Sequence, residues 1–349
     1  MNKGGQGSFP GGVPSAVEKR GMHHVGIDIA KRKVELLWLR DVETLKRKRK
    51  TFENTIEGAA ELKRWLGQQI EAAPEQVQIV MEATSVYHEL FAQELYAAGY
   101  RVCVVNPLQA KRFAQSHGLQ TKNDRHDPFL LARMSAERQT QLRAWEPEPP
   151  QIKHLKALLA RLVAVEKDLR RELNRLEKAQ ITAAPPAVME SLSGMIKALR
   201  EQARELRREI DKHIDQNPDL KRDRQLLESI PGIGEGVSSL LLSVIHSRRF
   251  TRASQLGAYL GLAPIEAESG DTVRGKATLA KTGPAWIRAK LYYPAIVAKR
   301  YNPDVAALYD RLLRRGMCKK AAIAAAMRKL VHIAFGVIKH QTPYQPQGA

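Results

Sequence analysis

Residues 25–40 read VGIDIAKRKVELLWLR and decide the fold of the first part of the chain. The apolar, β-branched run 25–30 predicts a strand, the basic residues 31–33 predict a turn, and residues 34–40 predict a second strand. The basic run KRKRKTF at 46–52 predicts a third strand. The chain therefore begins its folded part with three successive strands.

Strands and helices alternate after these three strands. TIEGAAELKRWLGQQI (55–70) has helical spacing, and VQIVMEA (77–83) predicts a fully buried strand. SVYHELFAQELYAAG (85–99) predicts an amphipathic helix that ends at Gly99, and RVCVVNP (101–107) predicts one more strand. This order predicts a mixed sheet with helices on its faces.

The rest of the chain has helical periodicity. A proline-rich linker at 146–150 precedes two long amphipathic patterns, which the sequence AAPP at 183–186 separates. These patterns predict either a helical hairpin within the chain or a dimerising coiled coil. From residue 217 the chain is predicted to be mostly helical. The predicted organisation is a disordered tail 1–22, an α/β domain 23–147, a helical coiled-coil region 148–216, a mostly α C-terminal domain 217–342 and a tail 343–349.

The charge balance indicates a polyanionic partner. The 349 residues include 57 basic and 37 acidic residues, which gives a formal net charge of +20. Neutralisation of phosphates by Lys and Arg is the usual source of nucleic-acid affinity, so nucleic acid is favoured over a ribosomal-type or merely basic protein.

Several classes of protein are disfavoured by composition. Cys103 and Cys318 are the only cysteines, too few for a zinc cluster or a disulfide framework, and a reducing compartment fits them. Cys103 lies in an apolar run and is predicted to be a buried strand residue. No stretch of about 18 consecutive apolar residues occurs, so no membrane span is expected. Residues 1–22 lack the apolar core of a signal peptide.

Four acidic residues are candidate metal ligands. Asp28 interrupts an apolar strand pattern, where a lone carboxylate is costly to bury unless it is paired or binds a metal. Glu82 ends another apolar strand; if the two strands are neighbours, both carboxylates reach the same end of the sheet. Asp124 and Asp127 are three residues apart and can face one side of a helical turn. Together these hard oxygen ligands suit Mg²⁺.

Each acid also has a structural explanation. Asp127 precedes Pro128, and Asp-Pro is an ordinary start of a helix. Glu82 could interact with the dipole of the helix that follows it. Asp28 has the weakest structural explanation, because strands rarely bury a lone acid.

Ser269 is a candidate nucleophile in the loop ESGDTVRGK at 268–276. Ser next to Gly is usually a turn. Arg274, Lys276 and Lys281 follow closely, so a phosphate could be clamped beside the hydroxyl, and Arg274 is the favoured clamp. The loop has no nearby His of a hydrolase triad, which argues against acyl chemistry.

Two further stretches are candidate nucleic-acid contacts. IPGIG at 230–234 matches a helix-hairpin-helix turn, in which Gly232 and Gly234 would let backbone N–H groups approach a phosphate; a simple helix-helix turn is an equal alternative. Lys46, Arg47 and Lys48 are expected on an edge strand, where they would follow a nucleic-acid backbone and block edge pairing.

At these residues the chain resembles the DEDD-motif insertion-sequence transposases, the bridge-RNA-guided serine recombinases. The matching stretches are GIDIAK, MEATSVY, NPLQAKRFAQSHGLQTKNDRHD, LLESIPGIGEG, LGAYLGLAP, ESGDTVRG and MRKLVHIAFGVIK, and they cover the chain from about residue 23 to the C-terminal tail. Two positions depart from the family pattern. Pro128 stands where the family usually has Ala, so Asp127 is expected at a helix start, and Ser85 stands where the family often has Gly.

The resemblance implies a RuvC-like N-terminal domain of ribonuclease H type, a coiled-coil region and a C-terminal transposase domain. It implies that Asp28, Glu82, Asp124 and Asp127 bind Mg²⁺ and that Ser269 forms a covalent phosphoserine bond with a cut DNA strand. It also implies a guide (bridge) non-coding RNA, target and donor double-stranded DNA, a tetramer made of dimers, and a nucleoid-associated location in the bacterial cytoplasm.

Three hypotheses about function follow. The leading one is an RNA-guided DNA recombinase that uses the four acids and Ser269. The second is a junction-resolving nuclease that uses metal and water and does not need the serine. The third is a non-catalytic architectural protein, which the net charge and the helical region would explain.

Overall fold

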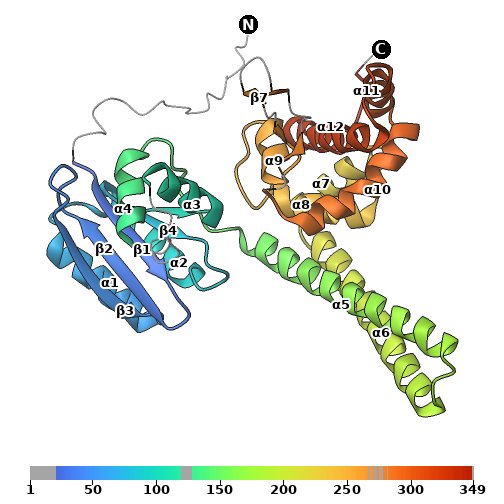
Figure 1. The fold of residues 1–349 in the computed structure, drawn as a ribbon, viewed down its shortest axis with the longest axis horizontal. Helices are drawn as coiled ribbons and strands as arrows, with labels where there is room; N and C mark the ends of the chain where they lie inside the picture. Colours follow the sequence, from blue (N-terminus) through green and yellow to red (C-terminus); the bar gives the residue numbers. More distant parts are fainter. Residues whose placement is uncertain are drawn as a thin grey trace, which may run out of the picture. The chain divides into compact units, whose positions relative to one another are not determined.

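The protein folds into two compact units, Met1–Pro147 and Glu148–Ala349. The computed structural model describes residues 21–118, 128–265, 268–269, 273–274, 278–280 and 282–347. Figure 1 shows a sheet with helices on its faces in the N-terminal unit, and a long helical hairpin joined to a group of helices in the C-terminal unit.

A mixed five-stranded sheet forms the centre of the N-terminal unit, in the order β3-β2-β1-β4-β5. Its strands are β1 (His23–Ile29), β2 (Lys33–Leu39), β3 (Arg47–Glu53), β4 (Val77–Glu82) and β5 (Arg101–Val105). β2 is antiparallel to both β1 and β3, whereas β1, β4 and β5 are parallel. The mixed sheet predicted from the sequence is confirmed.

Helices cover both faces of this sheet. They are α1 (Ile56–Gln69), the short 3-10 helix η2 (Pro74–Gln76), α2 (Glu89–Ala97), α3 (Pro107–Ser116) and α4 (Pro128–Glu137). One hydrophobic core joins alternate residues of β1 to α1 and α2. A second core joins β4 and β5 to α3 and α4. The period-2 alternation of strand side chains separates these two cores, so the unit has three layers.

The helix expected over residues 85–99 is shorter than predicted. Ser85 has a φ of 50°, in the left-handed region that interrupts a right-handed helix, and α2 begins only at Glu89. Gly99 follows the helix with a φ of 87°, the left-handed conformation that commonly terminates helices. Cys103 is fully buried in β5, as predicted.

The C-terminal unit begins with α5 (Pro150–Ile181) and α6 (Pro186–Asp215), which pack along each other as a hairpin. The sequence left open whether these patterns pair within one chain, and in the structure they do. The six further helices that the structure describes are α7 (Pro218–Glu228), α8 (Glu235–Ile245), α9 (Ala253–Tyr259), α10 (Ala285–Tyr301), α11 (Pro303–Arg314) and α12 (Lys319–His340). They share one core with the first turns of α5 and the end of α6.

α12 is the core helix of this unit. By length and composition alone it could cross a membrane, with a mean hydropathy of 1.6 over its most apolar window. Half of that window is buried, and α12 packs against α7, α9, α10 and α11. An apolar helix in the centre of a helical unit has this pattern, so its hydropathy is explained by packing.

Candidate active site

Asp28 and Glu82 lie at the same end of two neighbouring strands. β1 and β4 are parallel, and their register pairs Ile27 with Met81, so each acid directly follows a paired residue. The predicted grouping of the two carboxylates depends on these strands being neighbours, and they are. Glu82 is buried, with 7% of its surface exposed, and Asp28 is half-buried.

α4 packs directly on the face of β1 that carries Asp28. Gly26 lies two residues earlier on that face, and a Cβ there would lie 1.9 Å from the carbonyl oxygen of Pro128 and 2.5 Å from the nitrogen of Ala132. Only glycine permits this approach. Gly26 was not among the residues predicted from the sequence, although a glycine inside a strand pattern is a signal that another backbone lies close.

A buried polar cluster fixes the other end of α4. His24 Nδ1 and Ser135 Oγ are 2.9 Å apart, and the Gln78 amide donates to the carbonyl oxygen of Ser135. Burial lowers the pKa of His24 to about 4, and the charge of His23 acts in the same direction. The imidazole is therefore neutral near pH 7.

These contacts give α4 a direction. Ser135 lies beside His24, whereas Pro128 lies beside Gly26, so the helix start is directed toward the end of β1 that bears Asp28. The described part of α4 starts at Pro128, and proline is well tolerated in the first turn of a helix. Asp124 and Asp127, the other two predicted ligands, lie outside the described residues.

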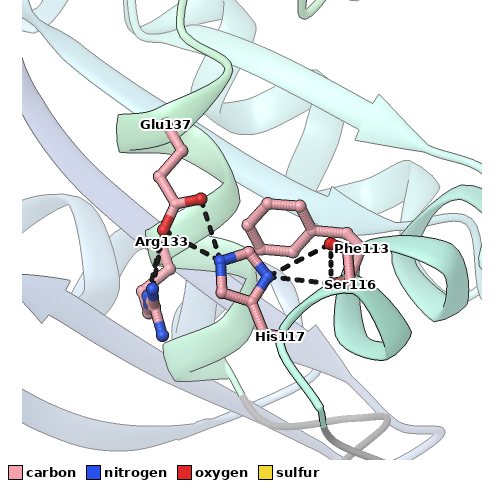
Figure 2. Close-up of polar contacts among 5 residues, drawn as sticks. All are labelled: Phe113, Ser116, His117, Arg133 and Glu137. Atoms are coloured by element: carbon pink, nitrogen blue, oxygen red, sulfur yellow. Dashed lines mark hydrogen bonds and ion pairs between the residues drawn. The ribbon is translucent and has the colours of Figure 1, made fainter.

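His117 links α3 to α4, the helices that precede and follow Asp124 and Asp127 in the sequence, as Figure 2 shows. It follows α3, and its Nδ1 lies 2.9 Å from the carbonyl oxygen of Phe113. Its Nε2 lies 2.9 Å from a carboxylate oxygen of Glu137, the last residue of α4. Arg133 forms an ion pair of 2.8 Å with the same carboxylate. The ends of α3 and α4 are thus held together.

The donor chemistry at this sheet edge suits a divalent metal. Asp28 and Glu82 supply hard carboxylate oxygens from adjacent strands, and a carboxylate as buried as Glu82 is stabilised by a nearby cation. Within the ranges that the structure describes, no group of three or more His, Cys, Asp and Glu residues gathers as a metal site. The described part therefore contains two of the four predicted ligands, Asp28 and Glu82.

Ser269 lies on a double hairpin between α9 and α10. β6 (Pro264–Ile265) pairs with β9 (Thr278–Leu279), and between them β7 (Glu268–Ser269) pairs with β8 (Val273–Arg274). The backbone register places Ser269 opposite Val273 and Arg274 opposite Glu268. This register brings the backbones of Ser269 and Arg274 close together. Lys276 and Lys281 lie outside the described residues.

Arg288 holds the base of this double hairpin. Its Nη1 donates to the carbonyl oxygen of Gly283 at 2.6 Å and to that of Leu260 at 3.2 Å. Leu260 is where the chain leaves α9, and Gly283 is where it returns toward α10. The sequence analysis did not identify this arginine, because its two partners are backbone atoms on distant segments.

The predicted basic strand is the edge strand β3. Two of its cations already have partners within the unit. The guanidinium of Arg47 lies 4.5 Å from the centre of the Phe129 ring, and Lys48 Nζ donates to the Gln69 side chain at 2.6 Å. Both side chains must leave or share these partners to contact a phosphate, whereas Lys46 is exposed just before the strand.

The two glycines of the turn between α7 and α8 differ. Gly232 has a φ of 101°, and a Cβ there would lie 2.8 Å from the Cβ of Ala298 in α10. Packing and backbone conformation therefore require it. Gly234 caps the start of α8, and nothing lies within 4 Å of its Cβ direction, so this end of the turn is open.

Comparison with known proteins gives the family. Residues 25–182 match the DEDD transposases of IS110 type, and residues 224–310 match the transposase IS116/IS110/IS902 family. The chain is 30% identical to the pilin gene-inverting protein of Moraxella bovis and 31% identical to that of Moraxella lacunata, in each case over 92% of this chain and 97% of the relative. It is 26% identical to an uncharacterized 43.6 kDa protein of insertion element IS110 from Streptomyces coelicolor, over 45% of this chain and 38% of the relative.

The chain therefore belongs to the IS110 family of DEDD transposases. Members of this class cleave and rejoin DNA and depend on divalent metal. DNA is accordingly a substrate of this enzyme, which agrees with its positive charge.

Proposed function

We propose that this transposase cuts DNA through a covalent phosphoserine intermediate on Ser269, assisted by Mg²⁺ on Asp28, Glu82, Asp124 and Asp127. The observation that carries the proposal is the alignment of Asp28 and Glu82 on adjacent parallel strands, with the start of α4 directed toward them. The mixed sheet is compatible with the RuvC-like domain of ribonuclease H type that we propose for this unit.

Covalent connection supports a role for Asp127. It is bonded to Pro128, whose carbonyl oxygen lies against Gly26, and consecutive Cα atoms are about 3.8 Å apart. Gly26 and Asp28 occupy the same face of β1. We therefore propose Asp127, which directly precedes Pro128 in the chain, as a further ligand.

In the proposed reaction, Ser269 Oγ loses its proton and attacks the phosphorus of the scissile diester. The bond from phosphorus to the 3′ oxygen breaks, and that oxygen takes up a proton to leave as a 3′-hydroxyl. The 3′-hydroxyl of a second strand then attacks the phosphoserine and restores the serine hydroxyl. Each step exchanges one phosphoester for another, so strand exchange needs no external energy source. Bound Mg²⁺ would neutralise charge on the phosphate.

The chain's own residues supply positioning and charge. Arg274, which pairs in the backbone register with Glu268, the residue before Ser269, is the proposed phosphate clamp, with Lys276 and Lys281 following it in the sequence. Gly234 at the start of α8, together with Lys46, Arg47 and Lys48 on the edge of the sheet, is proposed to contact nucleic-acid backbones. Gly232 supports that turn by its close packing against α10 rather than by contact with a nucleic acid.

We further propose that a guide (bridge) non-coding RNA pairs with both target and donor DNA, and that a tetramer made of dimers brings acids and serine together. This proposal rests on the family resemblance and on the charge of +20, which suits several nucleic-acid strands at once. Sequencing of RNA that purifies with the protein tests it. A single structured RNA encoded beside the gene is expected, and random cellular RNA would contradict guidance.

The test of the chemistry is capture of a protein–DNA adduct. Wild-type protein, incubated with Mg²⁺, the co-purified RNA and DNA carrying the element ends, is expected to give a band that resists detergent. Ser269→Ala removes the band, whereas Ser247→Ala, a buried serine within the same unit, retains it. Persistence of the adduct in Ser269→Ala would show that another residue is the nucleophile.

The same assay distinguishes this function from the alternative one. A junction-resolving nuclease would use only the carboxylates and water. The observation that favours such a nuclease is that Asp28 and Glu82 lie at the same end of adjacent strands. Cleavage that survives Ser269→Ala and stops with chelator would support this nuclease.

A further inference from the structure

The outer face of α10 exposes an unusual set of aromatic residues. Tyr293 and Tyr301 are 74% and 68% exposed, and Trp286, Tyr292 and Val297 are also exposed. Trp286, Tyr293, Val297 and Tyr301 recur at spacings of seven or four along the helix, so they form one continuous stripe. Large rings left in water on one helix face indicate a binding surface rather than scattered surface residues.

Cations are interleaved with these rings. The sequence of α10, AWIRAKLYYPAIVAKRY, contains four basic residues and no acid. Arg300 is exposed beside Tyr301, and Lys290 Nζ lies 2.7 Å from Glu166, whose carboxylate is also bonded by Arg207. The Glu166 carboxylate is thus shared between two cations. The other two basic residues of α10 have partners within the unit, because Arg288 donates to backbone carbonyl groups and Lys299 Nζ lies 4.9 Å from the centre of the Tyr309 ring.

A cavity opens on the same helix. It has a volume of about 380 Å³ and is lined by Leu279, Arg288, Ala289, Tyr292 and Met327. Its lining is mainly apolar, with the Tyr292 ring at one side. Tyr292 and Tyr293 are in edge-to-face contact, with ring centres 5.7 Å apart, so the cavity adjoins the exposed stripe.

We propose that this aromatic face of α10, defined by Trp286, Tyr292, Tyr293 and Tyr301, binds unpaired nucleotides by stacking. Exposed rings flanked by Lys and Arg suit single strands, because the ring holds a base and the cation holds the adjacent phosphate. In a duplex the base faces are already stacked, so these rings have no equivalent partner. A second copy of the same face would instead bring positive charges together.

The proposal adds a class of ligand to the function proposed above and does not depend on the serine chemistry. Leu279 belongs to β9, the inner strand at the base of the Ser269 double hairpin, and it also lines the cavity. A nucleotide base held in this cavity would lie beside the β6–β9 pair of the double hairpin. Unpaired nucleotides arise wherever strands are exchanged or an RNA guide opens a duplex.

The test compares a single strand with a duplex. Full-length protein is titrated against a fluorescent single-stranded RNA of about 20 nucleotides and against the duplex of the same sequence, over a range of salt. Tyr293→Ala with Tyr301→Ala is expected to weaken single-strand binding by about tenfold per ring. The salt dependence should be unchanged, and duplex affinity should change less than twofold. Tyr293→Trp should retain binding.

Three controls give the result its meaning. Val297→Ala removes an exposed apolar group without a ring and should leave affinity unchanged, whereas Arg300→Gln should lower the salt dependence by about one ion. Ser269→Ala should bind the single strand normally, so failure of the covalent chemistry leaves this test intact. Equal losses on single strand and duplex, no loss at all, or a change of molar mass in the tyrosine variants would overturn the proposal; the last would assign the face to a second copy.

Discussion

The acidic edge of the N-terminal unit and the serine segment of the C-terminal unit are built in opposite ways. Asp28 is the penultimate residue of a seven-residue strand and Glu82 the last residue of a six-residue strand, inside a sheet that is covered on both faces. Ser269 lies on a strand of two residues, carried by another two-residue pair and held at its base by Arg288. Metal ligands need fixed spacing, whereas a nucleophile that joins and releases DNA must reach different strands. We therefore expect substitutions at the acidic edge to act by changing the distances between carboxylates, and substitutions near Ser269 to act by changing the mobility of its hairpin.

The largest effect is expected from removing a carboxylate at the acidic edge. Asp28→Asn or Glu82→Gln should reduce DNA cleavage by about a thousandfold, because a bound metal lowers the barrier by several kcal/mol. Glu35→Gln is the matched control, since Glu35 lies opposite Asp28 on β2 and is paired with Lys33 at 2.6 Å. Cleavage rates with Mg²⁺ measure both, and an equal loss in the control would contradict the assignment.

Gly26→Ala tests the rigidity of the same region. The added Cβ would meet backbone atoms of α4 at 1.9 and 2.5 Å, which no side-chain rotation relieves. The expected loss is about 3 kcal/mol or more in the free energy of unfolding of the N-terminal unit. Gly67→Ala in α1, where nothing lies within 4 Å, should instead stabilise it by about 1 kcal/mol. Denaturant unfolding measures both, and similar values for the two variants would contradict the close packing.

The buried His24 predicts a pH dependence for the same unit. Its pKa falls from the ordinary value of 6.5 to about 4 on folding because the imidazole is buried, so the unfolded chain binds more protons between these values. Stability is therefore complete above pH 6.5 and declines as the pH falls toward 4, by up to about 3 kcal/mol. His24→Asn should remove this part of the decline. Unfolding measured across that range would contradict the cause if the variant and the wild type had the same slope.

The serine segment should respond differently. Arg288→Ala removes the bonds to the carbonyl groups of Leu260 and Gly283, and it should reduce adduct formation by about tenfold through a looser hairpin base. Metal binding at the acids and the unfolding of the N-terminal unit should not change. Arg249→Ala, an arginine elsewhere in the same unit, is the control for loss of charge. If both variants lose the same activity, the effect is electrostatic rather than positional.

The smallest effect is expected at Ser85, which follows β4 near Glu82. Its φ of 50° is unfavourable for a residue with a side chain, and glycine adopts it without strain. Ser85→Gly should raise the free energy of unfolding by about 1 kcal/mol or less. Thermal unfolding measures it, and a loss of stability would show that the serine side chain makes a compensating contact.

The sequence predicted the strands of the N-terminal unit because they are short, separated by turn signals and, apart from the basic strand β3, mostly apolar. The long patterns 150–181 and 186–215 were also clear, since helical spacing continues over many turns. The start of α2 was wrong, because the left-handed conformation of Ser85 has no signature in that residue type. Arg288 and His117 were missed because their partners come from distant segments.

By itself, the sequence determined which groups are available for chemistry here, and it predicted roles for carboxylates near strand ends, a serine among cations and a set of basic residues. It also determined whether most elements are strands or helices, because the spacing of apolar residues encodes the period of two or of 3.6 residues directly. Only the tertiary structure decided that β1 and β4 are neighbours, that α4 approaches Gly26 with its start toward Asp28, and that α10 leaves its aromatic rings uncovered. These are long-range contacts, and local periodicity does not specify which elements meet across a core.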